Sequence, residues 1–566
     1  MKRIVFIIAA LLCTASALAQ VTREVEVTKQ YVPKLPPARK LDMVPDKQDT
    51  VNIRPEIDYT IAPKSFASVL TTNKFRPATV TYWEYKKRYP FYVKAGAGFP
   101  LVSELDVYAS AERADVGYIT GYVNHRGRFS KVNGEYLLAD GGEPISFGDN
   151  NAQQMVNRIG INGGKYFGRY TLDGDVYYQS NMYHRYPQIL SDDQIDIDEV
   201  NFENAAVKVS LGDSFADLSK LNFAIYAAAD YYNDKSVQPV VLEQRRKLQQ
   251  FSTVLGAKFA RELPKGITAE ASVDYKGYYG MKSLDNYSDN ILSISAMVDW
   301  DIKSIFSAKA GLTYCYDHQP YAEEQKSNHI FPYLYAGADI FESGVFVPYV
   351  EVDGELINNS FQQLQLVNPY VAQLGTDISM LPNTSVYNVR LGIAGHTADN
   401  KLAYRVYGNG AFVNNSLFWY SPTPAYIDAV AARENIWSLV ASFEYKPISQ
   451  LYISAAAKGQ VYNVKGELNV ANCKPSMLGE LNIRYTHRKF VVGASAELVG
   501  KRTWTVAESV VSYPTYVDLG LTLDLFLNRQ CTLYIEGRNL ANAQIYRWAL
   551  YKEYGIGGLV GIKVQF

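Results

Sequence analysis

The chain has no long apolar run. After its first residues, no segment approaches about 18 consecutive apolar residues, the length that a transmembrane helix needs. Its mean hydropathy of −0.16 is typical of a soluble protein. This absence excludes a helical membrane protein. It does not exclude a membrane β-barrel, in which polar residues that face the lumen alternate with apolar residues that face lipid.

Cysteine and histidine are also scarce. Only 4 Cys and 6 His occur in 566 residues. Beyond Cys13, the thiols are Cys315, Cys473 and Cys531, which are far apart and odd in number, so no disulfide framework is expected although one bridge remains open. No two histidines have metal-ligand spacing, and we expect neither a metal site nor a cofactor. The histidines are His125, His184, His318, His329, His396 and His487.

Catalytic signatures are missing as well. The chain has no Gly-x-Ser-x-Gly elbow and no His-Glu-x-x-His sequence. His318 follows Asp317, but such neighbours arise by chance in a chain of this length. We therefore predict a protein without catalytic residues. The formal net charge of −1 argues against nucleic acid as a partner.

The first residues predict export. Lys2 and Arg3 precede a short apolar stretch, 4–12, and Ala17-Leu18-Ala19 has the small-x-small pattern of a cleavage site. Residues 1–19 are thus predicted to be a signal peptide. Cys13 follows Leu12, where a lipoprotein needs a small residue, so we do not expect lipidation.

Residues 20–88 form a basic, proline-broken leader. They contain 13 Lys/Arg and 8 Asp/Glu, whereas residues 89–566 contain 41 and 49. Proline fixes the backbone and removes a hydrogen-bond donor, so we expect an extended segment that lies in the periplasm or in a lumen. The prolines are Pro33, Pro36, Pro37, Pro45, Pro55, Pro63 and Pro77.

From residue 89 onward the sequence alternates with a period of two. In one stretch Val517, Leu519, Leu521 and Leu523 alternate with polar residues such as Asp518. Such rows favour strands with lipid on one side and water on the other, because a soluble sandwich of this length would need several domains and linkers. The 45 Tyr suit the membrane–water interface. We predict an all-β fold: a large antiparallel transmembrane β-barrel over 89–566, with about 22 strands (range about 16–22).

The last strand carries a terminal aromatic. Val560, Ile562, Val564 and Phe566 share one face, which is typical of the closing strand of an outer-membrane barrel. We interpret these four residues as a C-terminal signal for the barrel-assembly machinery.

Longer breaks in the alternation are expected to be extracellular loops. They fall near 181–199, 233–244, 318–327, 358–384 and 415–434, and shorter turns such as Gly168 separate other strands. The first loop is acidic and is either a solvated loop or a cation site that bridges to lipopolysaccharide. Its acidic residues are Asp192, Asp193, Asp196, Asp198, Glu199 and Glu203.

Two of these loops are unusually apolar. Phe418, Trp419, Tyr420 and Tyr426 offer either an aromatic binding surface or part of the interfacial aromatic girdle. The loop around 361–371 is too apolar for a free surface, so we expect it either to fold inward as a constriction or to dock on a partner. Its apolar residues are Phe361, Leu364, Leu366, Pro369, Tyr370 and Val371.

A family resemblance appears near the C-terminus. Asn539-Leu540-Ala541-Asn542, followed by Tyr546 and then by a final strand that ends in Phe, resembles the end of TonB-dependent receptor barrels. The chain also resembles plug-less barrel proteins of Bacteroidota. It departs from the receptors because the short leader replaces their globular plug. Within the leader, one alternating stretch resembles a TonB box and implies TonB as a partner. These residues are Glu24, Val25, Glu26, Val27 and Thr28.

Two functions follow as hypotheses. The first is solute transport across the cell outer membrane, in contact with lipid and lipopolysaccharide. The second is a non-conducting subunit of an envelope complex for barrel assembly, lipid transport or secretion. A barrel of this size leaks unless something closes it, so the leader, the long loops or a separate envelope protein must do so.

Overall fold

The computed structural model of the chain describes residues 89–138, 145–186, 199–236, 248–302, 305–321, 327–371, 381–423, 426–466, 468 and 470–566. The predicted signal peptide 1–19, the leader 20–88 and the TonB-box-like residues 24–28 lie outside the described residues. No helix in the described ranges is long and apolar enough to cross a membrane.

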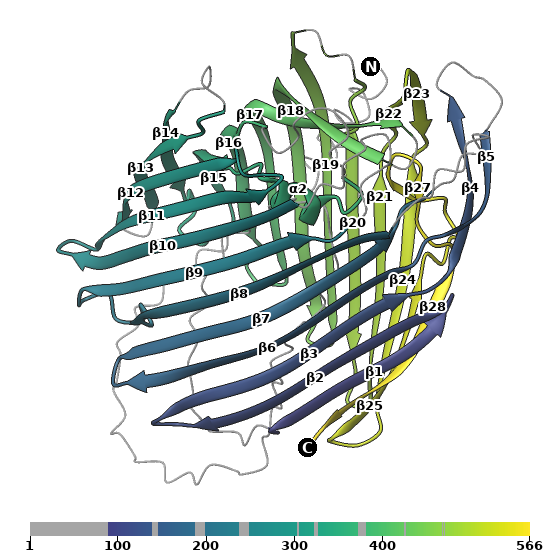
Figure 1. Cartoon of the computed structure of the whole chain (residues 1–566). Helices are drawn as coiled ribbons and strands as arrows, with labels where there is room; N and C mark the ends of the chain where they lie inside the picture. The colour runs from purple at the N-terminus through teal and green to yellow at the C-terminus, as the bar shows by residue number, and fades with distance from the viewer. Residues whose placement is uncertain are drawn as a thin grey trace, which may run out of the picture. The chain divides into compact units, whose positions relative to one another are not determined.

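The described residues form a closed antiparallel β-barrel of 22 strands, as the sequence predicts (Figure 1). Consecutive barrel strands pair with each other, and β1 pairs with β28 to close the ring. The barrel strands are β1 (Phe91–Phe99), β2 (Val102–Arg113), β3 (Gly117–Arg128), β6 (Gln154–Phe167), β7 (Tyr170–His184), β8 (Glu199–Asp213), β9 (Asn222–Asp234), β10 (Leu248–Leu263), β11 (Ile267–Lys282), β12 (Ser288–Ile302), β13 (Phe306–His318), β14 (Asn328–Ala338), β15 (Val347–Ile357), β16 (Thr384–His396), β17 (Leu402–Thr423), β18 (Tyr426–Ile448), β19 (Leu451–Lys465), β20 (Met477–Thr486), β21 (Phe490–Val499), β24 (Tyr516–Phe526), β25 (Cys531–Arg538) and β28 (Gly557–Gln565).

The connections differ between the two ends of the barrel. At the end where the chain terminates, most turns are short; Gly168 has a φ of 65° in the turn between β6 and β7, a left-handed conformation that suits glycine. The opposite end, called the long-loop end below, carries the longer connections and the remaining elements. These are β4 (Lys131–Leu138), β5 (Ile145–Asn151), α2 (Phe361–Val367), β22 (Arg502–Val506), β23 (Ser509–Tyr513), β26 (Tyr546–Trp548) and β27 (Tyr551–Lys552).

One of the loop predictions, that for 415–434, is wrong. Residues 415–423 and 426–434 are not a loop, because they extend β17 and β18 into a long paired hairpin. The pairing shifts register between Val413 and Ser416 and again between Tyr420 and Thr423. These irregularities break the alternation of apolar and polar residues, so the sequence reads as a loop where the backbone remains a strand.

The two faces of the wall follow the predicted alternation. Leu519 and Leu521 on β24 and Ile562 on β28 point outward and are exposed, as a lipid-facing row requires. On the inner face of the same two strands, the Lys563 ammonium binds the Asp524 carboxylate at 2.8 Å. The wall therefore separates an apolar exterior from a charged lumen.

This orientation predicts opposite effects for two neighbouring substitutions on β24. Leu521→Arg places a cation against the lipid-facing side near the middle of a transmembrane strand, which we expect to destabilise the barrel by about 2–4 kcal/mol. Thr522→Arg places the same side chain toward the lumen and should change stability little. Urea unfolding of the two variants in lipid vesicles measures the difference. Equal losses would contradict the assignment of the faces.

Candidate functional site: a lid of loops at the long-loop end

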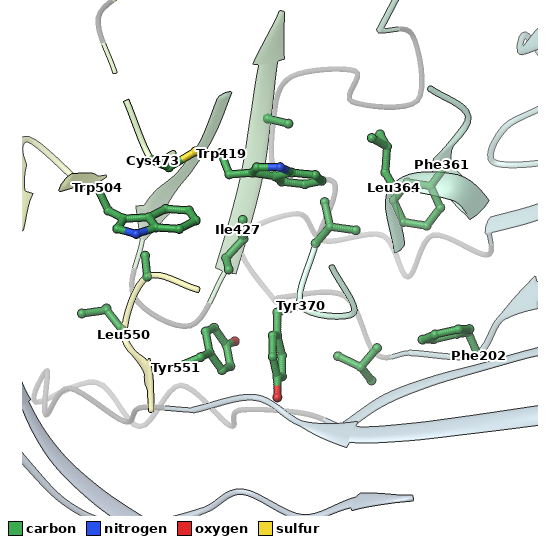
Figure 2. Close-up of a cluster of buried hydrophobic side chains, with 14 of the residues drawn as sticks. Phe202, Phe361, Leu364, Tyr370, Trp419, Ile427, Cys473, Trp504, Leu550 and Tyr551 are labelled. Carbon is green, nitrogen blue, oxygen red and sulfur yellow. The ribbon is translucent and has the colours of Figure 1, made fainter. Parts of the chain in front are cut away.

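Loops from distant parts of the sequence converge on one buried cluster inside the long-loop end (Figure 2). Inward-facing residues of the wall, including Phe202 on β8 and Tyr232 on β9, form one side of it. We call the part of the cluster that lies outside the ring of strands the lid. It comprises the connecting segments 358–371, 470–475, 502–513 and 545–552 and the end of the β17–β18 hairpin, 416–423 and 426–429. Because these residues bury aromatic and aliphatic side chains together, the hydrophobic effect holds the lid over the lumen.

Tyrosine stacking joins the lid to the wall of β7. The Tyr370 and Tyr551 rings are stacked with centroids 3.6 Å apart, and Tyr186 meets Tyr551 edge-on at 4.8 Å. The Tyr186 hydroxyl donates to the Lys552 carbonyl oxygen at 2.8 Å. Burial raises the pKa of all three phenols, so these tyrosines remain neutral.

A tryptophan group holds the other side of the lid. Trp548 lies edge-on to Trp419 on β17, with centroids 5.6 Å apart, and edge-on to Trp504 on β22, at 6.0 Å. The Arg502 guanidinium donates to the Tyr546 carbonyl oxygen at 2.6 Å. The segment 545–552 is therefore the central piece of the lid, between the tyrosine stack and the tryptophans.

The sequence that resembles the receptor barrels explains how this central piece is placed. Asn539 and Asn542 both have positive φ, a conformation that asparagine tolerates better than other non-glycine residues. The Asn539 amide donates to the Ala543 carbonyl oxygen at 2.9 Å, and its side-chain oxygen accepts from the Ala543 N–H at 2.8 Å. This turn after β25 sends the chain back over the mouth, where Tyr546 and Trp548 enter the lid.

A second attachment of the lid is polar and involves α2. Gln362 and Gln365 face β9 and β10, where they meet the carboxylates of Asp230 and Asp234. Gln250 on β10 donates to the Gln362 side-chain oxygen at 3.1 Å. Because the lumen-facing residues of these strands are polar here, the helix is bound by hydrogen bonds on one side and by apolar packing on the other.

Arg185 is a buried cation that is poorly partnered. It is 3% exposed, and two of its nitrogens, Nε and Nη1, have no hydrogen-bond partner among the described residues. Its Nη2 donates to the Val371 carbonyl oxygen at 3.5 Å, and its guanidinium lies 5.0 Å from the Tyr426 ring centroid. No described carboxylate lies within ion-pair distance of this guanidinium. A buried charge without such a pair is costly, so the cation–π contact with Tyr426 is part of what stabilises it.

Below the lid, charged pairs and tyrosines line the lumen. The Arg126 guanidinium binds Asp106 at 2.8 Å, and the Lys94 ammonium binds Glu104 at 2.5 Å. The Arg158 guanidinium lies 3.8 Å from the centroid of Tyr177. In the described residues no group of three His, Cys, Asp or Glu side chains could hold a metal ion. This part of the wall therefore presents ion pairs and tyrosine rings to the lumen.

The structure places the predicted aromatic surface inside the lid. Phe418, Trp419 and Tyr426 are buried on β17 and β18 rather than exposed on a loop, and Tyr420 donates to Asp428. For the loop around 361–371, the structure fits the inward alternative, because Phe361, Leu364, Tyr370 and Val371 are buried in the cluster.

The other predicted residues fall in separate places. Val560 and Ile562 on β28 and Phe566 directly after it are exposed, and Val564 is half-buried. The Phe566 ring stacks on Phe91, with ring centroids 5.3 Å apart. Of the acidic loop, residues 192–198 lie outside the described residues. Glu203 is on β8 and binds Lys235 at 2.7 Å, and Glu199 lies 3.2 Å from His184. The thiols of Cys315, Cys473 and Cys531 are free.

Sequence reasoning missed Arg185, Gln250, Gln362 and Gln365. A lone arginine after a strand and glutamines in an apolar stretch carry no local signal. Only the contact of α2 with strands more than 100 residues away reveals their role.

No family model and no curated protein sequence matches the chain. Solved structures do match its fold. The FrpB iron transporter from Neisseria meningitidis aligns with a TM-score of 0.65 at 12% identity, over 85% of this chain and 82% of FrpB. A variant of the ferric enterobactin receptor PfeA from Pseudomonas aeruginosa aligns with a TM-score of 0.62 at 11% identity, over 84% and 80%.

The pyoverdine outer membrane receptor FpvA from Pseudomonas aeruginosa also aligns, with a TM-score of 0.60 at 11% identity, over 85% of this chain and 79% of FpvA. The chain therefore shares the fold of outer-membrane receptor barrels. At identities this low, the likeness concerns the fold alone.

The stacked tyrosines predict a specific weak point. Tyr551→Ala removes a buried ring that contacts both Tyr186 and Tyr370. We expect the lid to lose about 3–5 kcal/mol of local stability while the ring of barrel strands remains intact. Hydrogen exchange at residues 185–186 and 370–371 should accelerate. As a control, Tyr485→Ala on the outer face of β20 should leave exchange at the lid unchanged. Unchanged exchange in Tyr551→Ala would show that the stack does not hold the lid.

Proposed function

We propose that the chain is an outer-membrane barrel that transports a solute, and that its own lid closes the lumen. The observation that carries this proposal is the charged, tyrosine-lined inner wall beneath a lid of loops. Ion pairs that face the lumen, such as Lys563–Asp524, indicate a wet interior, which a path for a polar solute requires. The shared fold with transporters and receptors supports the same reading.

The orientation and the export route belong to this proposal. We infer that the signal peptide 1–19 is cleaved, that the long-loop end is extracellular, and that the C-terminal strand is read by the barrel-assembly machinery. The named neighbours include an iron transporter and a ferric enterobactin receptor, so a ferric chelate is the first solute class to test. Energy coupling through TonB at residues 24–28 is part of the same proposal.

We assign the leader 20–88 a secondary role in closure. Its excess of basic residues, 13 against 8, complements the acidic excess of residues 89–566, 49 against 41. This asymmetry supports a leader that interacts with the lumen. The lid contacts described above join residues of 89–566 to one another, so we expect the lid to close the long-loop end without the leader.

Planar-bilayer conductance tests the proposal. We expect the full chain, and the chain without residues 20–88, to remain largely closed, because the lid is present in both. Combining the deletion with Tyr551→Ala should produce a large open pore.

Two results would contradict parts of this scheme. A large pore from the deletion alone would make the leader the main barrier. No conductance from the combined variant, in protein that still migrates as a folded barrel, would overturn transport through the lumen.

A further inference from the structure

We propose that residues 358–371, which carry α2, are the movable gate of the lid, and that side-chain amides latch this gate to carboxylates on the barrel wall. We call these residues the α2 segment. The inference rests on the proposed function, because a gate has meaning only in a barrel that conducts. Beyond that function, the inference identifies the part of the lid that moves and the hydrogen bonds that hold it closed.

The first half of the latch lies between α2 and the wall of β9 and β10. The Gln362 amide donates to Asp230 Oδ1 at 2.5 Å, and the Gln365 amide donates to Asp234 Oδ2 at 3.2 Å. Ser252 donates to the Gln362 side-chain oxygen at 3.2 Å. The outward-facing neighbours of Asp230 and Ser252 on these strands, Tyr231 and Phe251, are exposed, so the latch is on the inner face of the wall.

The second half lies at the base of the segment, on β12 and β13. The Asn358 amide donates to Asp289 Oδ2 at 2.6 Å. Asn383, which immediately precedes β16, donates to Asp289 Oδ2 at 2.8 Å and to Asp317 Oδ1 at 3.0 Å. Three wall aspartates, Asp230, Asp234 and Asp289, therefore accept from amides of the α2 segment, and Asn383, at the other end of the same connection, joins Asp289 to Asp317. This repetition of a single chemistry distinguishes the latch from scattered polar contacts.

The α2 segment is attached differently from the paired strands of the lid, and the segment 545–552 is a third case, because its strands β26 and β27 pair with each other and it is held to the lid by aromatic packing. β22 pairs with β23 through five residue pairs, β23 pairs with β4, and β17 pairs with β18 along the long hairpin. In the part of the chain that the structure describes, the α2 segment has one backbone pairing to another element, the bridge between Val371 and Ile427. The segment can therefore move by breaking side-chain contacts while the backbone pairing of the other lid elements remains intact.

The latch is incompletely satisfied when closed. Among the described residues, Gln250 Oε1 and Gln365 Oε1 are buried without a hydrogen-bond partner. Buried acceptors that lack a donor favour a state in which water reaches them. The wall that opening would uncover is polar and hydrates readily. Phe361 and Leu364, which are buried in the cluster, oppose opening and keep the gate closed by default.

The helix supplies its own control for a test in the full chain. Gln362→Ala with Gln365→Ala removes two latch amides and keeps the apolar face of α2. Gln363→Ala makes the same chemical change at an exposed position one residue away. Each background also carries Leu364→Cys, a buried reporter, with the three free cysteines Cys315, Cys473 and Cys531 replaced by Ala. A membrane-impermeant maleimide measures how often the reporter becomes accessible.

We expect the latch variant to be labelled at least about tenfold faster than the Gln363→Ala control, a change that corresponds to about 1.4 kcal/mol in the opening equilibrium. Conductance of the same protein should show more frequent openings. Equal labelling rates in folded barrels would overturn the gate. Faster labelling without any conductance would support the movement of the segment and refute transport, so the two failures are distinguishable.

A crosslink provides the converse test. Val371→Cys with Ile427→Cys, in the same cysteine-free background with Leu364 retained, places two thiols at the one backbone bridge of the segment. Oxidation should suppress the openings of the latch variant, and reduction should restore them. If openings persist in the oxidised, fully crosslinked protein, a different part of the lid moves.

Discussion

Closure of the ring by β1 and β28 is the constraint on which the rest of the structure depends. In lipid no water is available to pair with an open strand edge, so a spanning sheet must satisfy every backbone group within itself. Here the first and last strands pair along eight positions, and Phe91 and Phe566 exchange reciprocal backbone hydrogen bonds of 3.0 Å at the end of the seam. The exposed apolar row on β28 and the terminal Phe566 therefore both serve the closure of the ring in lipid.

Closing a ring of this many strands creates a second problem, because side chains on the wall alone do not fill so wide a lumen. The chain solves it at one end with loops that fold inward. The turn at Asn539 directs Tyr546 and Trp548 across the mouth, and Tyr370 meets Tyr551 there. Apolar side chains that would be a liability on exposed loops instead form a core of their own above a polar lumen.

The barrel itself was predictable from the sequence because its alternation is local and repeated. The apolar row from Val517 to Leu523 predicts which face of the strand meets lipid, and in the structure Val517, Leu519 and Leu521 are exposed on the outer face. The error at 415–434 has a physical cause: two register shifts interrupt the alternation while the strand pairing continues. The inward folding of Phe361 and Leu364 was one of two alternatives that composition left open. The contacts of α2 were beyond the sequence, because Gln362 and Asp230 are 132 residues apart and neither carries a local signal.

The lid divides its stabilisation between two kinds of interaction. Ring stacking and strand pairing are lost only when large apolar surfaces are exposed or several backbone bonds break together, so the β17–β18 hairpin and the segment 545–552 behave as a fixed frame. Amide-to-carboxylate bonds exchange readily for bonds to water, and they are concentrated where α2 meets β9 and β10. A mouth built from aromatic contacts alone would be too stable to open, and one built from polar contacts alone would leak. Concentrating the amide-to-aspartate contacts on the α2 segment lets the remaining lid stay folded while that segment moves.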